Sequence, residues 1–119
     1  MSETSDILMV QRMGEVHIVE LLQPSILDQH LIQRIRDGIM EILTRSGTFK
    51  MVISFENVSH LASAMLGVLM ELNNKVKEHK GEVRLCSLQP SIREVFKLTA
   101  LDKVLKIFKS TDDAMVKFS

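Results

Sequence analysis

The chain has very few of the residues from which disulfides, metal sites and aromatic binding surfaces are built. It contains a single cysteine, Cys86, no tryptophan, no tyrosine and only five phenylalanines. One cysteine excludes an intramolecular disulfide and a cysteine-rich metal site, and this usage is typical of a protein from a reducing compartment. The scarcity of aromatic side chains also argues against binding of single-stranded nucleic acid, which relies on stacking onto aromatic rings.

Net charge and long hydrophobic runs are absent as well. The 15 basic and 15 acidic side chains give a formal net charge of zero, which argues against electrostatic binding to nucleic-acid phosphates. No apolar run approaches the roughly 20 residues of a membrane-spanning helix. Residues 1–10 also lack the basic flank and apolar stretch of a secretory signal. We therefore expect a cytoplasmic protein with no direct nucleic-acid contact and no membrane insertion.

The sequence offers no recognisable catalytic, cofactor or metal-binding motif. None of the four histidines has a second histidine three or four residues away, as a helical metal site would require; they are His17, His30, His60 and His79. The five glycines form no phosphate-binding loop, and no G-x-S-x-G elbow surrounds Ser63. We predict that the protein is not an enzyme and has no catalytic residue, metal or cofactor.

Length and hydrophobic content predict one compact domain. A chain of 119 residues fits a single domain, and a hydrophobic content of 45% supplies enough side chains for a core. Residues 1–5 are polar and are expected to form a flexible N-terminal tail. The domain is then expected to span residues 6–119.

Hydrophobic periodicity predicts strands that alternate with helices. Strands are predicted at residues 7–10, 15–22, 50–55, 82–86 and, less clearly, 104–107. Helices are predicted at residues 28–45, at 64–79, from Pro90 onward and at 111–118. This order is typical of an α/β sandwich with a mostly parallel sheet. Because the first two strands form an antiparallel pair, the predicted central sheet of four to five strands is mixed, with helices packed against it.

The pentapeptide LQPSI occurs twice, at residues 22–26 and 88–92. Pro-Ser is a favourable opening for a helix, so both copies predict a helix start. The flanking residues do not match, and the repeat therefore gives no support for an internal duplication.

Residues 51–69 combine a predicted buried strand, a short polar loop and a serine, Ser63, at the start of an apolar helix. A serine at this junction can cap the helix, which stabilises it by about 0.5–2 kcal/mol. A phosphate added there would lie at the positive end of the helix dipole, so the same serine can also act as a switch. The two roles are compatible, and the residues alone leave both open.

Three segments together resemble the STAS domain of bacterial anti-sigma factor antagonists: residues 51–69, 81–86 and 90–102. The family pattern is an apolar strand, a D-S-S/T-G-L-G loop and an amphipathic helix, followed by a strand led by glycine. A helix with the pattern P-x-V-x-x-V-L-x-x-T-G-L comes next. The residues that match this last motif in order are Pro90, Val95, Thr99 and Leu101.

The resemblance implies a single STAS-like domain that regulates transcription by partner switching. In that family the unmodified anti-anti-sigma factor binds a serine switch kinase that acts as the anti-sigma factor, and so frees a sigma factor. Phosphorylation of a serine or threonine in the loop reverses this binding, and a PP2C-type phosphatase resets it. Other members are non-phosphorylated scaffolds of stress-sensing complexes or transporter-associated subunits, which is the alternative function. The resemblance also leaves a homodimer open.

The loop departs from the family pattern. The aspartate of the pattern falls on Ala62, the first hydroxyl on Ser63, the second on Ala64 and the glycine on Met65. The resemblance therefore implies that Ser63 is the phospho-acceptor candidate, and the departures at Ala62, Ala64 and Met65 favour the alternative of a constitutive scaffold.

The same resemblance implies a partner-binding surface around Ser63. The residues expected to contact a partner are Pro24, Ser25, Ser59, His60, Ala62, Ala64 and Met65. His60 is also open to the interpretation of an ordinary loop histidine. For Met65 a place in the core competes with a partner contact, which its flexible side chain would suit.

Overall fold

The central element of the fold is a mixed sheet of five strands. The computed structural model describes residues 6–118, so the tail expected at residues 1–5 lies outside the described residues. The strands are β1 (Leu8–Met13), β2 (Val16–Leu21), β4 (Lys50–Ser54), β6 (Glu82–Cys86) and β7 (Lys106–Phe108), in the spatial order β1-β2-β4-β6-β7. β1 is antiparallel to β2 and the other neighbours are parallel, which confirms the predicted mixed sheet.

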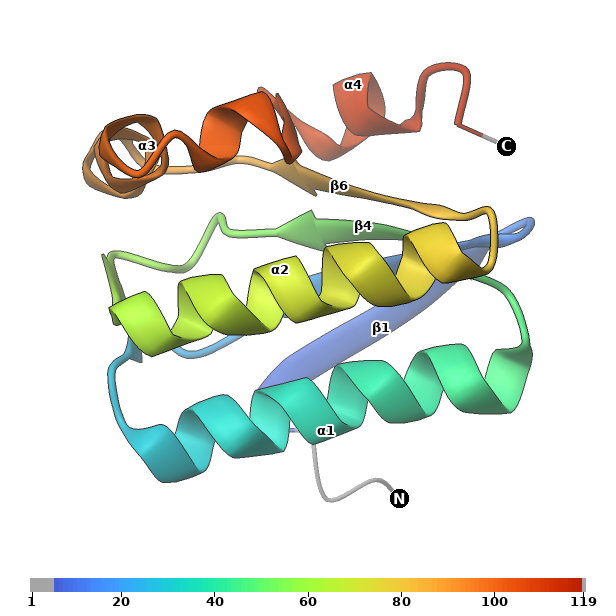
Figure 1. Ribbon diagram of the computed structural model, residues 1–119, viewed down its shortest axis with the longest axis horizontal. Helices are drawn as coiled ribbons and strands as arrows, with labels where there is room; N and C mark the ends of the chain where they lie inside the picture. The colour runs from blue at the N-terminus through green and yellow to red at the C-terminus, as the bar shows by residue number, and fades with distance from the viewer. Residues whose placement is uncertain (1–5, 119) are drawn as a thin grey trace.

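Helices cover both faces of this sheet. They are α1 (Gln29–Ser46), α2 (Ser63–Glu78), α3 (Pro90–Leu98), the 3₁₀ turn η1 (Leu101–Lys103) and α4 (Thr111–Met115). α1 and α2 lie side by side on one face (Figure 1). α3 buries its apolar side in the same layer, whereas α4 packs on the opposite face. Within residues 6–118, no helix is both long and apolar enough to cross a membrane.

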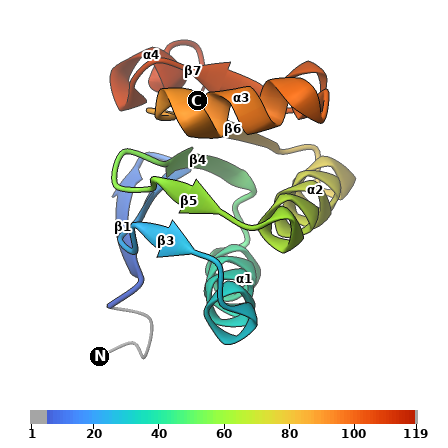
Figure 2. The same cartoon turned by 90° about the vertical axis from the view of Figure 1, so that its left-hand side faces the viewer.

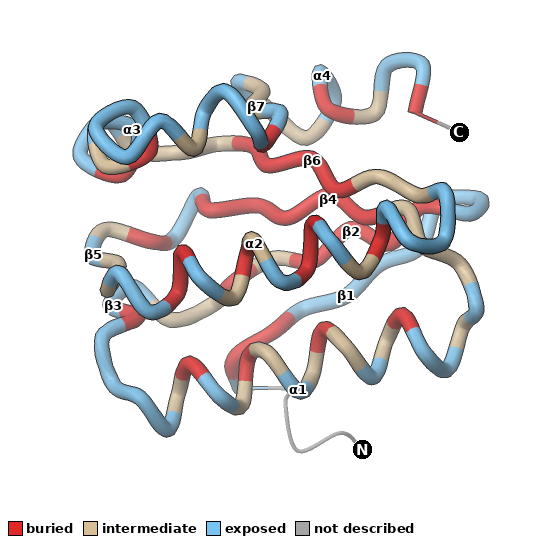
Figure 3. Tube along the Cα trace, viewed as in Figure 1, coloured by how far each residue is buried: buried red, intermediate tan, exposed pale blue. Residues whose placement is uncertain are grey.

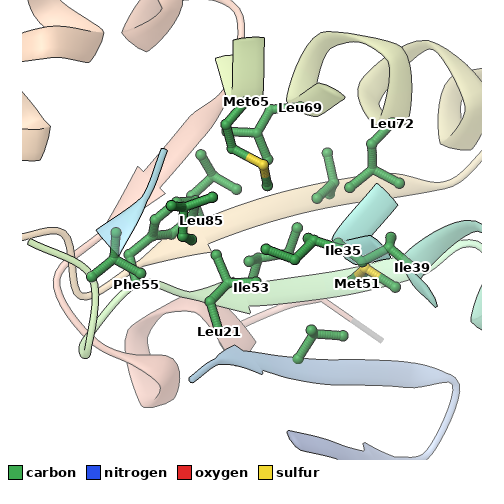
Figure 4. Packing of buried hydrophobic residues seen from close by; sticks show 14 of the residues in the cluster. Leu21, Ile35, Ile39, Met51, Ile53, Phe55, Met65, Leu69, Leu72 and Leu85 are labelled. Atoms are coloured by element: carbon green, nitrogen blue, oxygen red, sulfur yellow. The ribbon is translucent and has the colours of Figure 1, made fainter. Parts of the chain in front are cut away.

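The main core lies between the sheet and the layer of α1, α2 and α3. The central strands β2, β4 and β6 are buried almost along their whole length, whereas β1 is exposed beyond its first residue (Figure 3). Figure 4 shows side chains of β4 and β6 packed against those of α1 and α2. Its labelled residues are Leu21, Ile35, Ile39, Met51, Ile53, Phe55, Met65, Leu69, Leu72 and Leu85. Strands buried on both faces explain the near-continuous apolar runs that the sequence shows there.

A second, smaller core lies on the other face of the sheet. Its buried members are Val16, Ile18, Val52, Cys86, Ala114 and Phe118. Successive strand residues point to opposite faces, so Val52 belongs to this cluster and its neighbour Ile53 to the main core. Cys86 is a fully buried free thiol, as expected for a structural cysteine.

The first helix begins four residues later than its predicted opening at Pro24-Ser25. Asp28 is the N-cap, with its Oδ2 accepting from the backbone N–H of Leu31 at 2.9 Å. Gly47 ends the helix with a φ of 71° and donates its N–H to the carbonyl of Leu43 at 3.0 Å. Ser25–Ile26 instead forms a short strand, β3, which pairs in parallel with β5 (His60–Leu61).

The two copies of LQPSI therefore take different structures. In the second copy Pro90 occupies the first turn of α3, as predicted. In the first copy the carbonyl of Pro24 accepts from the N–H groups of Ser59 and His60, at 2.8 and 3.1 Å. The helix opening predicted there is wrong because this long-range pairing outweighs the local preference of Pro-Ser.

The last two predicted elements are shorter or shifted. The strand predicted at residues 104–107 lies at Lys106–Phe108, and the helix predicted at 111–118 ends at Met115. The helix ends early because the side chain of Arg84 donates to the carbonyls of Ala114 and Val116, at 2.8 and 2.9 Å. Those carbonyls are thus satisfied without a further helical turn.

His17, on β2, joins the sheet to the connection between α1 and β4. Its Nε2 lies 2.9 Å from the hydroxyl of Ser46 and 2.8 Å from that of Thr48. The side chain is buried, and this burial, together with the nearby positive charge of Arg12, lowers its pKa below the ordinary value of 6.5.

A pair of glycine substitutions tests the packing around α2. Gly67 is exposed within α2 and has open space where a Cβ would lie, so Gly67→Ala should raise the free energy of unfolding by about 0.5–1 kcal/mol. A Cβ at Gly81 would collide with the carbonyl oxygen of Phe49, which is held by the N–H of Glu82. Gly81→Ala should therefore lower the free energy of unfolding by about 1–3 kcal/mol or more. Urea unfolding of both variants checks this; similar changes for the two would contradict it.

The buried His17 predicts a loss of stability at mildly acidic pH. Because its pKa is lower in the folded state, the unfolded chain binds its proton first as the pH falls below about 6.5. The contribution of His17 to the free energy of unfolding should therefore be constant above that pH and decrease below it. Urea unfolding between pH 8 and 5 should show a shallower decrease for His17→Gln than for the wild type. The exposed control His30→Gln should keep the wild-type slope, and equal slopes for all three proteins would refute the assignment.

Candidate partner-binding site

Three loops meet at the edge of the sheet where the parallel strands end. Residues 22–28 follow β2, residues 55–62 follow β4 and residues 87–89 follow β6. Parallel strands carry their carboxyl ends to the same edge, so these loops gather there although they are far apart in the sequence. The amide of Gln89 donates to the carbonyl of Glu56 at 3.2 Å, which joins the third loop to the second.

The small β3–β5 sheet joins the first loop to the second (Figure 2). Besides the two hydrogen bonds to Pro24, the N–H of Ala62 donates to the carbonyl of Ile26 at 2.9 Å. Predicted partner-binding residues from two distant segments thus lie side by side: Pro24 and Ser25 in the first segment, Ser59 and His60 in the second. The sequence showed no sign of this sheet, because two-residue strands have no measurable periodicity.

A hydroxyl and imidazole cluster connects the same segments. The Ser59 hydroxyl donates to the carbonyl of Pro24 at 3.2 Å, and Nδ1 of His60 lies 3.1 Å from the Ser59 oxygen and 3.4 Å from that of Ser25. His60 is exposed and has no ion pair within residues 6–118. Its contacts with the two hydroxyls join the segment around Ser25 to the segment around Ser59.

Buried anchors hold the second loop against the body of the domain. Phe55 and Val58 are fully buried, and the ring of Phe55 meets that of Phe96 edge-on with centroids 6.2 Å apart. The amide of Asn57 donates to the carboxylate of Glu20 at 3.2 Å and to a backbone carbonyl of β2 at 3.3 Å. These contacts hold the loop in place, and with it the start of α2 that follows.

Ser63 is exposed in the first turn of α2, but it does not cap the helix. The N-cap is Ala62, whose extended backbone has a φ of −77° and a ψ of 152° and whose side chain cannot accept a hydrogen bond. The capping role expected for Ser63 is wrong because the helix begins one residue earlier than predicted. The Ser63 hydroxyl makes no hydrogen bond within the described part of the chain, so it is free to face solvent.

Met65 does not contribute its side chain to the surface. It is 0% exposed and points with Leu69 into the main core (Figure 4). The helical spacing of Met65, Leu69, Leu72 and Val76 places all four toward the sheet. The partner contact expected of Met65 is therefore corrected to a core position, whereas Ala64 is exposed beside Ser63.

The part of this surface that surrounds Ser63 carries no charged side chain, and the exposed acidic residues Asp28 and Glu56 lie in the same loops outside it. We call the exposed and half-buried residues Pro24, Ser25, Leu27, Ser59, His60, Ala62, Ser63 and Ala64 the carboxyl-edge surface. No Asp, Glu, Lys or Arg occurs from residue 21 to 27 or from 57 to 70. Leu27, which is 57% exposed, was not predicted. Its sequence signal is an apolar residue that directly precedes the helix cap and lies off the buried stripe of the helix.

The groups with shifted pKa values lie outside this surface. Hydrogen bonding to Arg36 lowers the pKa of Glu71, and the same ion pair raises the pKa of Arg36. Both groups lie on the exposed sides of α1 and α2. No cluster of His, Cys, Asp and Glu that could hold a metal ion exists among residues 6–118. The carboxyl-edge surface is thus suited to contacts through shape, apolar groups and neutral hydrogen bonds.

The chain belongs to the STAS domain family, whose sequence pattern it matches over residues 8–114. This match spans the five-stranded sheet, α1, α2, α3 and η1, and all but the last residue of α4.

Individual relatives are distant in sequence and close in fold. The anti-sigma F factor antagonist of Paenibacillus polymyxa is 23% identical over 91 residues, which cover 76% of this chain and 78% of that protein. An anti-sigma factor antagonist structure from Mycobacterium paratuberculosis has a TM-score of 0.81 at 22% identity, over 98% of this chain and 97% of that one. The Bacillus cell fate determinant SpoIIAA, solved in its phosphorylated form, has a TM-score of 0.71 at 18% identity, over 94% and 99%. These structures share the fold described above.

One substitution at the start of α2 and one at the start of α1 test whether Ser63 and Asp28 cap these helices. Ser63→Ala should change the free energy of unfolding by less than about 0.5 kcal/mol, because its hydroxyl has no partner to lose. Asp28→Ala should lower it by about 0.5–2 kcal/mol, because it removes the side-chain cap of α1. Chemical unfolding followed by circular dichroism measures both. An equal loss for Ser63→Ala would restore the capping role.

Proposed function

We propose that this chain is a regulatory protein-binding module of the anti-sigma factor antagonist type. Its partner is an anti-sigma factor that is also a serine switch kinase, and binding takes place through the carboxyl-edge surface. Phosphorylation of Ser63 ends this binding and a PP2C-type phosphatase restores it. Family membership and the named relatives support the class of function.

The observation that carries the proposal is the place of Ser63 on this surface. Its hydroxyl is exposed, unpaired within the described chain and located where a rigid loop enters α2. The β3–β5 pairing holds the other expected contact residues beside it. A kinase can therefore reach the hydroxyl while the partner-binding residues keep their positions.

The neutral character of the surface explains how one phosphate could control binding. A phosphoserine carries a charge of about −1.5 to −2 at neutral pH. The N-terminal end of α2 would tolerate this charge because the helix dipole and free N–H groups favour an anion there. A partner complementary to a neutral surface has no group to neutralise it, and an unpaired charge buried in an interface strongly weakens binding. The fold would thus remain intact while the affinity falls.

A second candidate function is a scaffold or transporter-associated subunit that binds its partner constitutively. It is favoured by Ala62 and Ala64, which stand where the family pattern has an acid and a second hydroxyl. The buried Met65 likewise replaces the glycine of the pattern. In this case the carboxyl-edge surface binds without modification of Ser63.

Charge at Ser63 should weaken binding to a purified switch kinase from the same cells. Ser63→Glu should raise the dissociation constant at least about tenfold, because it places an unpaired charge in the contact. Ser63→Ala should stay within about twofold of the wild type, since no hydrogen bond is lost. Isothermal titration calorimetry measures these constants.

Ser91→Glu is the matched control, because Ser91, like Ser63, is an exposed serine in the first turn of a helix. It should leave the affinity unchanged. Equal weakening by both glutamates would remove Ser63 from the interface. Intact mass spectrometry of protein from its native cells separates the two candidate functions, because a phosphate on Ser63 is expected for the switch and not for the scaffold.

A further inference from the structure

We propose that residues 110–118, the C-terminal strap, detach from the outer face of the sheet as a unit while the rest of the domain stays folded. Arg84 is the latch that holds the strap closed, and its release opens access to Cys86. This inference is independent of the carboxyl-edge surface, which lies at the loops between strands and helices, whereas the strap covers the sheet face opposite α1 and α2 (Figure 2).

Hydrogen bonds from one side chain supply most of the polar attachment of the strap. Nη1 of Arg84 donates to the carbonyls of Ala114 and Val116 at 2.8 and 2.9 Å. The other polar contact joins the Cys86 thiol to the hydroxyl of Thr111 at 3.5 Å. All remaining hydrogen bonds of the strap within residues 6–118 are internal to it.

Arg84 is itself held in a fixed position beneath the strap. Its Nε donates to the carboxylate of Glu82 at 2.7 Å, and its guanidinium lies 4.1 Å from the ring centroid of Phe118 and 5.2 Å from that of Phe108. The residue is buried on a central strand. Burial opposes ionisation of Glu82, but hydrogen bonds from Arg84 and Lys106 outweigh it and lower the pKa of the carboxyl. The latch is therefore a charged group that remains on the sheet when the strap leaves.

Apolar attachment of the strap is small and separate from the main core. Only Ala114 and Phe118 of the strap are buried, and they contact the second cluster alone. The sheet lies between this cluster and the packing of α1 and α2, so loss of the strap leaves the main core complete. The helix in the strap has five residues, which is too short to persist once released. Segments with few buried contacts open locally at a lower free energy than the whole domain unfolds.

Release of the strap would uncover a defined surface. Cys86, Val52, Val16 and Ile18 lie beneath it. A groove of about 270 Å³ already runs beside the strap, and its lining residues are Met9, Gln11, Ile18, Glu20, Ser54, Glu56 and Thr111. Ile18 and Thr111 border both regions, so the uncovered surface would continue this groove. The buried thiol, which is inert while closed, would become reactive in the open form.

Alkylation of Cys86 tests the strap directly, because it is the single cysteine of the chain. Folded protein is treated with iodoacetamide at constant pH and the single adduct is followed by intact mass. Phe118→Ala and Arg84→Met should each raise the labelling rate at least about tenfold, because they weaken the closed form and labelling follows the open population. Val116→Ala, an exposed position in the same segment, should stay within about twofold.

Urea separates local release from global unfolding. In low urea the labelling rate of the wild type should be nearly independent of urea, because release exposes little surface. A labelling rate that rises steeply with urea would overturn the proposal. So would labelling rates that change among the variants only as their midpoints of global unfolding change. An unchanged rate in Phe118→Ala would also overturn it. This variant lies outside the sheet, and it therefore decides the question even where Arg84→Met does not fold.

Discussion

The parallel pairing of β2, β4 and β6 is the constraint on which the rest of this structure depends. These strands are buried on both faces, so each face must be covered, and every parallel step requires a crossover helix on one side. α1, α2 and α3 supply that cover, and the strap supplies it on the opposite face. The same pairing carries the three strand ends to one edge. The candidate site therefore lies where it does because the parallel pairing that builds the core also brings these three strand ends together.

The two faces of the sheet differ in how firmly they are covered. On one face, long amphipathic helices bury continuous stripes, of which Ile35, Ile39 and Leu43 on α1 are an example. On the other, one short segment depends on Arg84 and on Phe118. The free energy gained by burying apolar surface is roughly proportional to the buried area. The face covered by the long helices therefore contributes most of the stability. The second is free to serve as a movable part, because its loss leaves the main core packed.

Much of the fold could be predicted from the sequence because most elements carry their own periodic pattern. The stripe of α2 and the apolar runs of β4 and β6 were located within one or two residues, and the mixed sheet followed from their order. The candidate loop was located through Ser63 and its resemblance to the STAS pattern. The β3–β5 sheet could not be predicted in this way. Its strands are two residues long, and their pairing depends on contacts between residues about 35 positions apart.

The sequence by itself determined the class of fold, the buried stripes and the neutral character of the segments that form the carboxyl-edge surface. These properties depend on residue type and local spacing. Tertiary structure alone decided that the first LQPSI ends in a short strand and the second opens a helix, since the first segment pairs with residues 59–61. It also placed Met65 in the core, left Ser63 without a capping role and brought Arg84 under the C-terminal strap. Each of these outcomes depends on a contact between distant segments, which forms only when the sheet brings them together.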